Sequence, residues 1–393
     1  MNLLTNGRVI TRDEGGKGYY EKGAVAYEGT KIVEVGEEAA LRAKYPQAEI
    51  IDAKGGVIMP AFINAHTHIY SALARGLSIV GNNPTNFYEV LDGTWWAMDR
   101  KLTLEGSRAS ADALYIDCIK QGVTTIFDHH AAYCEIPGSL FQIGESAKKF
   151  GIRSCLCYEV SDRDGEEKCL QAIKENADWI TYCEQQKDPM LAAMFGGHAL
   201  FTISDKTFDR MVEANNGRTG YHIHVSEGMN DVYDSLQNYG RRPVQRLQDH
   251  GILGEKTILG HCIHVNTAEM DIIRETNTMV VNNPESNMGN AIGICPVLQL
   301  YKRGILLGMG TDAYTNDMLE SLKVALCSQR SQNCLPNVGW CEVTDMLFKN
   351  NAKIGARYFP DQLGVLKAGA AADIIVMDYK PFTPFSDENI DGH

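Results

Sequence analysis

Eight short runs of apolar, β-prone residues recur along residues 61–312, and segments with helical periodicity separate them. Strands that are apolar along their whole length are typical of parallel sheets that helices cover. Eight such strands, alternating with helices, are the number that closes into a TIM-type (β/α)₈ barrel. The predicted strands are Ala61–His66, Thr124–Asp128, Arg153–Glu159, Met194–Ile203, Gly220–Val225, Thr257–His261, Thr278–Asn282 and Ile305–Asp312. The predicted helices include Glu105–Gln121, Glu166–Glu184, Asp231–His250, Thr267–Thr276 and Asp317–Cys327.

The two ends of the chain have a different pattern, in which short strands are broken by turns. Within residues 1–57 the turn signals are Asp13-Glu14-Gly15-Gly16 and Glu28-Gly29, and residues 371–378 return to a strand pattern. We therefore expect residues 1–57 and 360–393 to form one composite small β-sandwich domain. Residues 58–359 would form the barrel, so the predicted fold class is α/β.

Charge and cysteine usage limit what the chain can bind and where it works. A net charge of −13 and a pI near 5.3 repel phosphate backbones and anionic lipid, so we expect no nucleic-acid and no membrane partner. The 11 cysteines form no CxxC pair, which indicates a reduced compartment and buried thiols. Without a signal peptide or a long apolar run, the predicted location is cytoplasmic. A homodimer is left open.

Polar side chains gather where the predicted strands end, which is the edge at which barrel enzymes carry their chemistry. His66 and His68 lie two residues apart, so on an extended strand both side chains project to one face and can chelate one cation. Asp312 ends an apolar strand, where a carboxylate must be paired, exposed or bound to a metal. Because histidines end the neighbouring strands, we interpret Asp312 as a metal ligand; the alternative is a helix N-cap.

Further polar residues near strand ends allow two interpretations each. His224 is either a ligand or a core histidine, and Glu227 is either catalytic or a solvated loop residue. His222 shares a face with His224 one layer deeper and is predicted to be structural. Of the pair His129-His130, one should face the pocket and the other should pack, and alternation along the strand does not say which.

These residues resemble the amidohydrolase superfamily, in its deaminase branch of guanine deaminase and chlorohydrolase-like enzymes. A closer likeness, to the SsnA-type aminohydrolases of anaerobic purine catabolism, rests on residues 92–100, 127–131 and 387–393. The resemblance covers essentially the whole chain. The matching motifs are Pro60-Ala61-Phe62-Ile63-Asn64-Ala65-His66-Thr67-His68, His224-Val225-Ser226-Glu227, Gly260-His261, Ser286-Asn287-Met288, Gly310-Thr311-Asp312 and residues 364–376.

The resemblance implies a mononuclear metal site and a set of catalytic residues. Glu227 would shuttle protons, and His261 would hold the attacking hydroxide or stabilise the tetrahedral adduct. Asp312 would also help to deliver a proton to the leaving amine. The implied ligands are His66, His68, His224 and Asp312.

The predicted substrate contacts are His198, Asp99, Trp95, His129 and His130. The resemblance places His198 at a position that often contacts substrate, and Asp99 at an acidic contact of some relatives. Trp95 and Trp96 are adjacent indoles in a long segment after the first strand, where a planar heterocycle could stack. Neighbouring side chains in an extended segment point apart, so we expect one indole to pack and the other to approach the substrate.

Two features depart from the family pattern. Relatives often carry a histidine in the seventh-strand motif where this chain has Asn282, which puts any pocket contact there in doubt. Family chains also usually continue beyond Gly392-His393 with further strands, so we expect a shortened or incomplete terminal sheet.

Three imidazoles and a carboxylate suit one Zn²⁺, with Fe²⁺ as the alternative, and leave a position open for water. Residues 194–203 contain no lysine of the kind that bridges two metals in binuclear relatives. Activated water would attack a carbon flanked by nitrogens in a small purine-like heterocycle and release ammonia. The alternatives are hydrolytic opening of an oxidised purine ring and, more remotely, a non-catalytic scaffold of the same fold.

Overall fold

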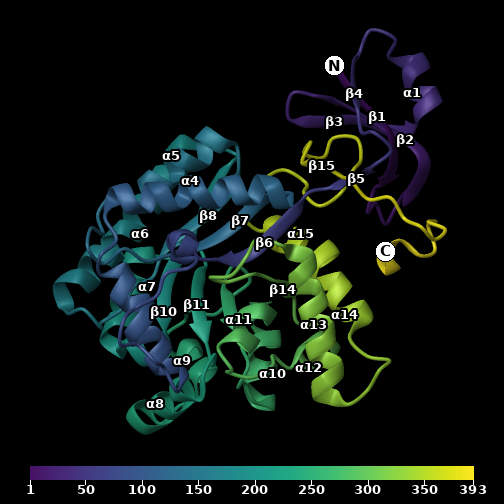
Figure 1. Cartoon of the computed structure of the whole chain (residues 1–393). Helices are drawn as coiled ribbons and strands as arrows, with labels where there is room; N and C mark the ends of the chain where they lie inside the picture. Colours follow the sequence, from purple (N-terminus) through teal and green to yellow (C-terminus); the bar gives the residue numbers. More distant parts are fainter. The chain divides into compact units, whose positions relative to one another are not determined.

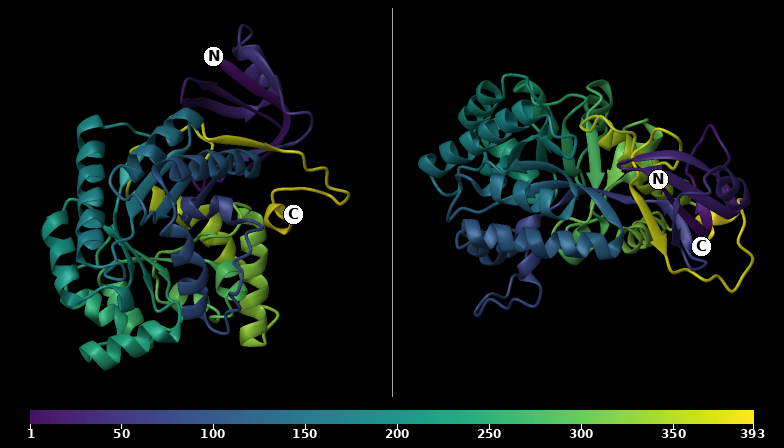
Figure 2. Two further views of the ribbon diagram at one scale, coloured as in Figure 1. Left: turned by 60° about the vertical axis from the view of Figure 1, so that its left-hand side comes forward. Right: turned by 90° about the horizontal axis from the view of Figure 1, so that it is seen from above.

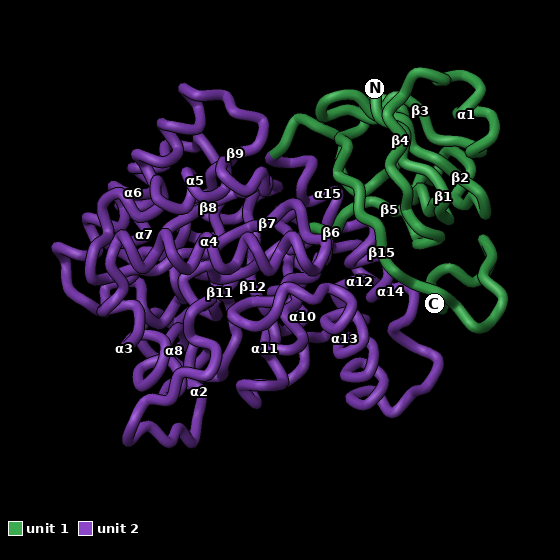
Figure 3. Tube along the Cα trace, turned by 45° about the horizontal axis from the view of Figure 1, so that its top comes forward, with its two compact units in different colours: residues 1–63, 359–393 green, residues 64–358 purple.

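The computed structural model describes residues 1–393, and the chain divides into two compact units. Residues 1–63 and 359–393 form unit 1, and residues 64–358 form unit 2 (Figure 3). That these units are separate domains with boundaries at residues 57 and 360 stays a prediction. No helix combines the length and the apolar character that crossing a membrane requires. All 11 cysteines are free, but four of them are exposed, contrary to the expectation of buried thiols.

Unit 1 contains one mixed sheet of six strands, in the order β15-β5-β1-β2-β3, with β4 paired to β1. Strands β4 and β5 run parallel to β1, whereas β2 is antiparallel to β1 and β15 is antiparallel to β5. The predicted sandwich of both termini therefore takes the form of a single sheet. Its elements are β1 (Asn2–Ile10), β2 (Tyr19–Glu28), β3 (Lys31–Glu37), α1 (Glu38–Lys44), β4 (Glu49–Asp52), β5 (Val57–Pro60), β15 (Ile374–Met377) and η5 (Ile390–Gly392).

Alternation along the strands gives this sheet two buried faces. On one face, Leu3 and Ala26 pack with Leu41 of helix α1. On the other, Leu4 and its neighbours pack with residues 365–370 from the returning C-terminal segment. A period of two thus explains why consecutive residues of β1 belong to different clusters.

Unit 2 contains two parallel sheets, one of order β6-β7-β8-β9 and one of order β10-β11-β12-β13-β14. The predicted fourth strand is interrupted at Met194 and ends at residue 199, after which η3 (Leu200–Thr202) begins. The predicted eighth strand is also shorter, and Asp312 lies beyond it. The strands are β6 (Phe62–Thr67), β7 (Val123–His130), β8 (Arg153–Tyr158), β9 (Leu191–Ala193), β10 (Phe195–Ala199), β11 (Tyr221–Val225), β12 (Ile258–His261), β13 (Met279–Asn282) and β14 (Leu307–Met309).

Backbone hydrogen bonds join the two sheets at both edges. At one seam, the N–H groups of Thr311 and Asp312 donate to the carbonyl oxygen of His66, each at 3.0 Å. At the other, Val160 donates to Gly196 at 3.3 Å and accepts from the N–H of His198 at 2.9 Å. With β9 and β10 as one interrupted strand, eight strands complete the predicted barrel, and Figure 2 shows the helices around it.

Most predicted helices are present, with three differences. The predicted helix 231–250 is two helices, because Gly240 adopts a φ of 64° and Pro243 starts the next helix. Helix α5 was not predicted, and α13 continues to Asn333. The helices (Figure 1) are α4 (Leu104–Gln121), α5 (Ser139–Phe150), α6 (Glu166–Gln186), α7 (Asp205–Asn215), α8 (Met229–Tyr239), α9 (Pro243–Asp249), α10 (Thr267–Glu275), α11 (Pro284–Gly289), α12 (Val297–Lys302), α13 (Met318–Asn333), α14 (Trp340–Asp345), η4 (Met346–Asn350) and α15 (Asn351–Gly355).

The long segment between β6 and α4 is helical over much of its length, rather than extended as predicted. It contains η1 (Ile69–Ala74), α2 (Phe87–Val90), η2 (Leu91–Trp95) and α3 (Trp96–Asp99). The side chain of Asn86 caps α2 by accepting a hydrogen bond from the N–H of Glu89 at 3.1 Å. We call residues 85–99 the cap segment.

We expect Gly196→Ala to destabilise the protein, because a Cβ at this position would overlap the carbonyl oxygen of Tyr158 at the barrel seam. Forcing atoms into a packed site costs about 1–3 kcal/mol of the free energy of unfolding, measurable by urea denaturation. Gly254→Ala is the matched control, because no atom lies within 4 Å of the place that its new methyl group would take. Equal urea midpoints for the two variants would contradict a tightly packed seam.

Candidate active site

The four predicted metal ligands and the predicted catalytic residue His261 converge at the C-terminal ends of barrel strands. His66 is on β6 and His68 follows it, His224 is on β11, His261 ends β12, and Asp312 follows β14. All five residues are buried. One ligand atom from each of four of them, His66, His224, His261 and Asp312, lies within 4.8 Å of the other three.

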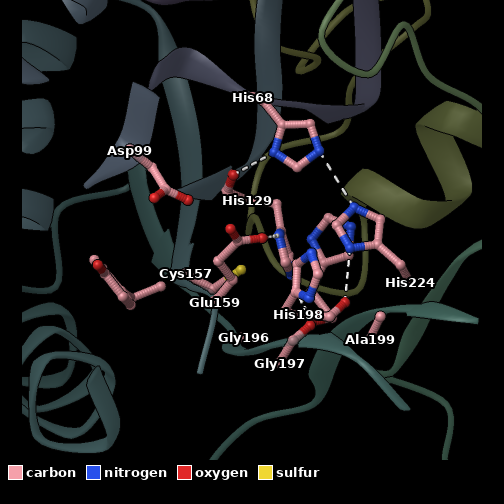
Figure 4. Close-up of polar contacts among 12 residues, drawn as sticks. His68, Asp99, His129, Cys157, Glu159, Gly196, Gly197, His198, Ala199 and His224 are labelled. Carbon is pink, nitrogen blue, oxygen red and sulfur yellow. Dashed lines mark hydrogen bonds and ion pairs between the residues drawn. The ribbon is translucent and has the colours of Figure 1, made fainter. Parts of the chain in front are cut away.

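Two of the imidazoles present lone pairs to the same point. The Nδ1–H of His68 donates to the carbonyl oxygen of His129 at 2.6 Å, and that of His224 donates to the carbonyl oxygen of His198 at 2.7 Å (Figure 4). Their Nε2 atoms are therefore unprotonated in the neutral rings, yet they lie only 3.2 Å apart. Asp312 Oδ1 is 2.9 Å from Nε2 of His68. A cation, either a proton on His68 or a metal ion, must therefore lie between these atoms, and the donor types fit a metal ion.

His66 completes the same arrangement. Its Nδ1 shares a hydrogen bond of 2.7 Å with Nε2 of His222, which supports the ring from below. Its Nε2 is buried without a hydrogen-bond partner, 3.8 Å from Asp312 Oδ1. A buried polar atom without a partner requires an explanation, and a ligand role supplies one. His222 thus takes the structural place that the sequence predicts for it.

Glu227 and His261 lie beside the cluster. Oε1 of Glu227 is 3.6 Å from Nε2 of His261, which is 3.6 Å from Oδ2 of Asp312. Nδ1 of His261 makes a hydrogen bond of 2.7 Å with Asn287 Oδ1, so its Nε2 faces the two carboxylates. His261 and Asp312 have φ values of 68° and 57°, left-handed conformations that turn the chain at these strand ends.

The surroundings shift the pKa values of the Glu227 and Asp312 carboxyl groups in opposite directions. Burial, reinforced by Asp312 and Asp231, raises the pKa of Glu227 well above its ordinary value. Burial also opposes ionisation of Asp312, but His68, His261 and the Ser286 hydroxyl outweigh it and lower the pKa of Asp312. These surroundings therefore favour the protonated form of Glu227 and the ionised form of Asp312.

An aromatic pocket opens above the cluster. Aromatic rings from the cap segment and from the loops after β6 and β14 form its upper part, and polar groups form its floor. Of the predicted substrate contacts, Trp95 and His198 line it. The lining residues are His68, Tyr70, Phe87, Leu91, Trp95, Trp96, Glu159, His198, His224, Glu227, Ser286, Asn290, Asp312, Ala313 and Tyr314.

The other predicted contacts, Asp99, His129 and His130, do not line the pocket. Arg163 holds Asp99 through both guanidinium nitrogens, at 2.5 and 3.4 Å, so this carboxylate is already occupied. The ring of His129 lies beneath the cluster, with its centroid 4.5 Å from that of His224. His130 is directed toward Ser107, at 3.5 Å. Both histidines thus lie behind the site, and neither lines the pocket, although one of them was expected to face it.

Sequence analysis missed Glu159, a buried carboxylate that follows β8 and lines the pocket. Burial opposes its ionisation, but His198, His129 and Arg163 outweigh burial and lower the pKa of Glu159 to about 2. The signal was available, because Glu159 is the last residue of the predicted third strand. The rule that chemistry collects at strand ends applies to this residue as well.

A family model described as the amidohydrolase family matches residues 57–392. The chain belongs to the amidohydrolase family. A second, shorter match covers residues 23–48 and is described as an imidazolonepropionase-like composite domain of bacteria. The predicted family is therefore confirmed, together with its barrel fold.

Curated relatives of this amidohydrolase are deaminases by name. A 5'-deoxyadenosine deaminase from Methanobrevibacter smithii is 31% identical over 364 residues, which cover 91% of this chain and 80% of that protein. A 5-methylthioadenosine/S-adenosylhomocysteine deaminase from Thermococcus sibiricus is 30% identical, with coverage of 96% and 85%. The predicted enzyme class, a hydrolase that acts on C–N bonds, is confirmed, and the scaffold alternative is set aside.

A solved structure has the same fold. It is an adenosine deaminase from Xanthomonas campestris with bound zinc, which superposes with a TM-score of 0.83 at 23% identity. The match covers 96% of this chain and 84% of that chain. Together with the buried His and Asp cluster, the family places this chain among enzymes whose fold holds a metal ion.

We expect the purified protein to contain about one zinc or iron per chain, because four ligand groups surround a single point. His66→Ala and Asp312→Ala should each lose the metal, whereas His250→Ala, at a surface pair with Asp209, should retain it. Elemental analysis by mass spectrometry measures this. Two stoichiometric metals per chain would contradict a mononuclear centre.

The adjacent indoles should respond differently to truncation. Trp96 is buried against Tyr88 and His198, with ring centroids 5.5 and 5.8 Å away. Trp96→Ala should therefore destabilise the fold, by about 3–5 kcal/mol for a fully packed aromatic ring. Trp95 is half-buried and lines the pocket, so Trp95→Ala should chiefly raise KM. Thermal melts and steady-state kinetics separate the two effects; early melting of both with unchanged KM would make the cap segment purely structural.

Proposed function

We propose that this amidohydrolase removes an amino group from a purine-type heterocycle by hydrolysis. The observation that carries the proposal is that Glu227 and Asp312 flank His261, each with a carboxylate oxygen 3.6 Å from its Nε2, in an aromatic pocket. Deamination needs one group that accepts a proton from water and another that donates one to the ring. The two carboxyl groups meet these needs because their environments separate their pKa values.

His66, His68, His224 and Asp312 would hold one divalent ion, zinc in the first place and iron as the alternative. When bound, such an ion supplies Lewis acidity and lowers the pKa of a coordinated water from about 15.7 toward 7. The donor set supports zinc, since imidazole nitrogens and one carboxylate oxygen are ligands that it prefers. The zinc in the structural neighbour from Xanthomonas campestris agrees with this choice.

The protein's own residues would handle the protons. Asp312 would accept a proton through its carboxylate and pass it to the leaving amine. Glu227 would donate its carboxyl proton to a ring nitrogen, where negative charge develops, and its neighbour His261, 3.6 Å away, would orient the attacking water by accepting a hydrogen bond at Nε2. The short hydrogen bond from Ser286 to Oδ2 of Asp312 would fix the carboxylate in place.

The pocket supports a flat, nitrogen-rich substrate. Tyr70, Trp95, Trp96 and Tyr314 provide aromatic surface, and His198 adds a hydrogen-bonding edge. The names of the curated relatives point in the same direction, because their substrates contain an adenine ring with an exocyclic amine. We therefore assign the chain to purine catabolism. The free cysteines favour a reducing compartment such as the cytoplasm.

Ammonia release from a panel of purines tests the proposal. The panel contains adenine, guanine, 5'-deoxyadenosine, 8-oxoguanine, xanthine and urate, with products identified by mass spectrometry. Glu227→Gln should retain the metal but lose activity by about 10²–10⁴-fold, the usual contribution of a general acid or base. Ring-opened products without ammonia, or a Glu227→Gln enzyme with near-wild-type kcat, would overturn the assignment.

A further inference from the structure

Glu159 is a buried carboxylate in the pocket that the proposed chemistry does not use. Its side chain is 2% exposed, and it lines the same pocket as Glu227 and Asp312. Its Oε2 atom has no hydrogen-bond partner. Leaving a buried charged acceptor without a donor is costly, so such a group calls for a partner that the protein itself does not supply.

The nearest cation is committed elsewhere. Arg163 directs its two terminal nitrogens to Asp99, and its Nη2 is 3.8 Å from Oε1 of Glu159, beyond hydrogen-bonding distance. The guanidinium is also held over the rings of Tyr133 and Trp96, at 4.1 and 5.0 Å from their centroids. One fixed cation therefore serves two buried carboxylates, and Asp99 receives the hydrogen bonds.

His129 does not satisfy Glu159 either. Its Nδ1 lies 3.2 Å from Oε2 (Figure 4), but both atoms remain without an aligned hydrogen bond. The other ring nitrogen, Nε2, faces the carbonyl oxygens of Gly197 and His222 at 3.0 and 3.1 Å, so it carries a proton and anchors the ring. The imidazole cannot turn toward Glu159 without breaking these contacts.

The position of Glu159 indicates what it would contact. One carboxylate oxygen lies within 4.8 Å of ligand atoms of both His198 and His224, and His224 is a proposed metal ligand. A substrate ring bound over the metal site would therefore lie within reach of Glu159. Nδ1 of His198 shares a hydrogen bond of 2.8 Å with the hydroxyl of Thr202, which fixes the imidazole ring. The other ring nitrogen of His198, Nε2, would then be available to the ligand.

We propose that Glu159 accepts a hydrogen bond from a ring N–H of the substrate, which makes it a specificity-determining residue for heterocycles with a free ring N–H. Neutral adenine nucleosides have no ring N–H, whereas free purine bases and oxopurines have one or more. The enzyme should thus prefer bases to their N-methylated or ribosylated forms. The inference rests on the proposed function, because it assumes that the pocket takes a purine-type ring.

A hydroxyl of ribose is the other donor that could reach a carboxylate. The location near His224 favours the ring, because a sugar attached to the far side of the purine would lie farther from the metal site. A comparison of free base, N-methyl base and nucleoside separates these two donors, since only the nucleoside carries hydroxyl groups.

Equilibrium binding tests the inference independently of turnover. Intrinsic tryptophan fluorescence of the zinc-loaded Glu227→Gln protein would be titrated with adenine, guanine, their 7-methyl and 9-methyl forms, and 5'-deoxyadenosine. Methylation of the nitrogen that faces Glu159 should weaken binding by about 10- to 100-fold, the loss expected for a hydrogen bond to a charged group. Adding Glu159→Gln should reduce this preference to a few-fold.

Glu175→Gln is the matched control, because it neutralises another buried carboxylate, which accepts hydrogen bonds from the N–H groups of Gly138 and Leu140 and does not line the pocket. It should leave the preference for N–H ligands unchanged, with folding of both variants checked by thermal melts. Should Glu159→Gln fail to fold, the preference with Glu159 in place still tests the inference: equal binding of N–H and N-methyl forms overturns it.

Three other results would overturn it as well. They are an unchanged preference in a folded Glu159→Gln protein, a preference lost with Glu175→Gln instead, and nucleosides that bind more tightly than bases through Glu159. Failure of the proposed function has a different signature, because no purine would then release ammonia whatever its binding constant.

Discussion

The carbonyl oxygen of His66 accepts hydrogen bonds from the backbone N–H groups of Thr311 and Asp312, each at 3.0 Å. These bonds tie the first barrel strand to the segment after the last one, and they place His66 and Asp312 at the same edge. Candidate ligands from opposite ends of the barrel sequence thereby become neighbours. Closure of the barrel and assembly of the candidate metal site are consequently the same event.

Once the barrel is closed, charge balance governs the remaining polar groups. A buried carboxylate is tolerated when it is protonated, paired or bound to a cation, and each solution occurs here. Burial and Asp312 raise the pKa of Glu227 and so favour its protonated form, whereas Asp99 is paired with Arg163. Asp312 stands among imidazoles that fit a cation. Glu159 has an ion pair with His129 at 3.2 Å but no hydrogen bond to its Oε2, so it can still accept one from a ligand.

The barrel can be predicted from the sequence, because its strands and helices follow periodic patterns. Apolar runs mark strands, and polar residues such as His66 and Asp312 stand out at their ends. Local backbone effects were harder to predict: Gly240 divides a helix, and Asp312 adopts a left-handed φ of 57° beyond a shortened strand. Such deviations depend on one or two residues, and a periodic pattern does not register them.

Substrate contacts were predicted least well, for a physical reason. Whether a carboxylate such as Asp99 is available to a ligand depends on whether a cation of the protein already pairs with it. Its partner Arg163 lies 64 residues away in sequence, so the pairing cannot be read from a local pattern. Likewise, the cap segment folds as short helices, so the directions of Trp95 and Trp96 follow helical geometry rather than strand alternation. Substrate specificity in this barrel therefore depends on tertiary pairings that strand periodicity does not reveal.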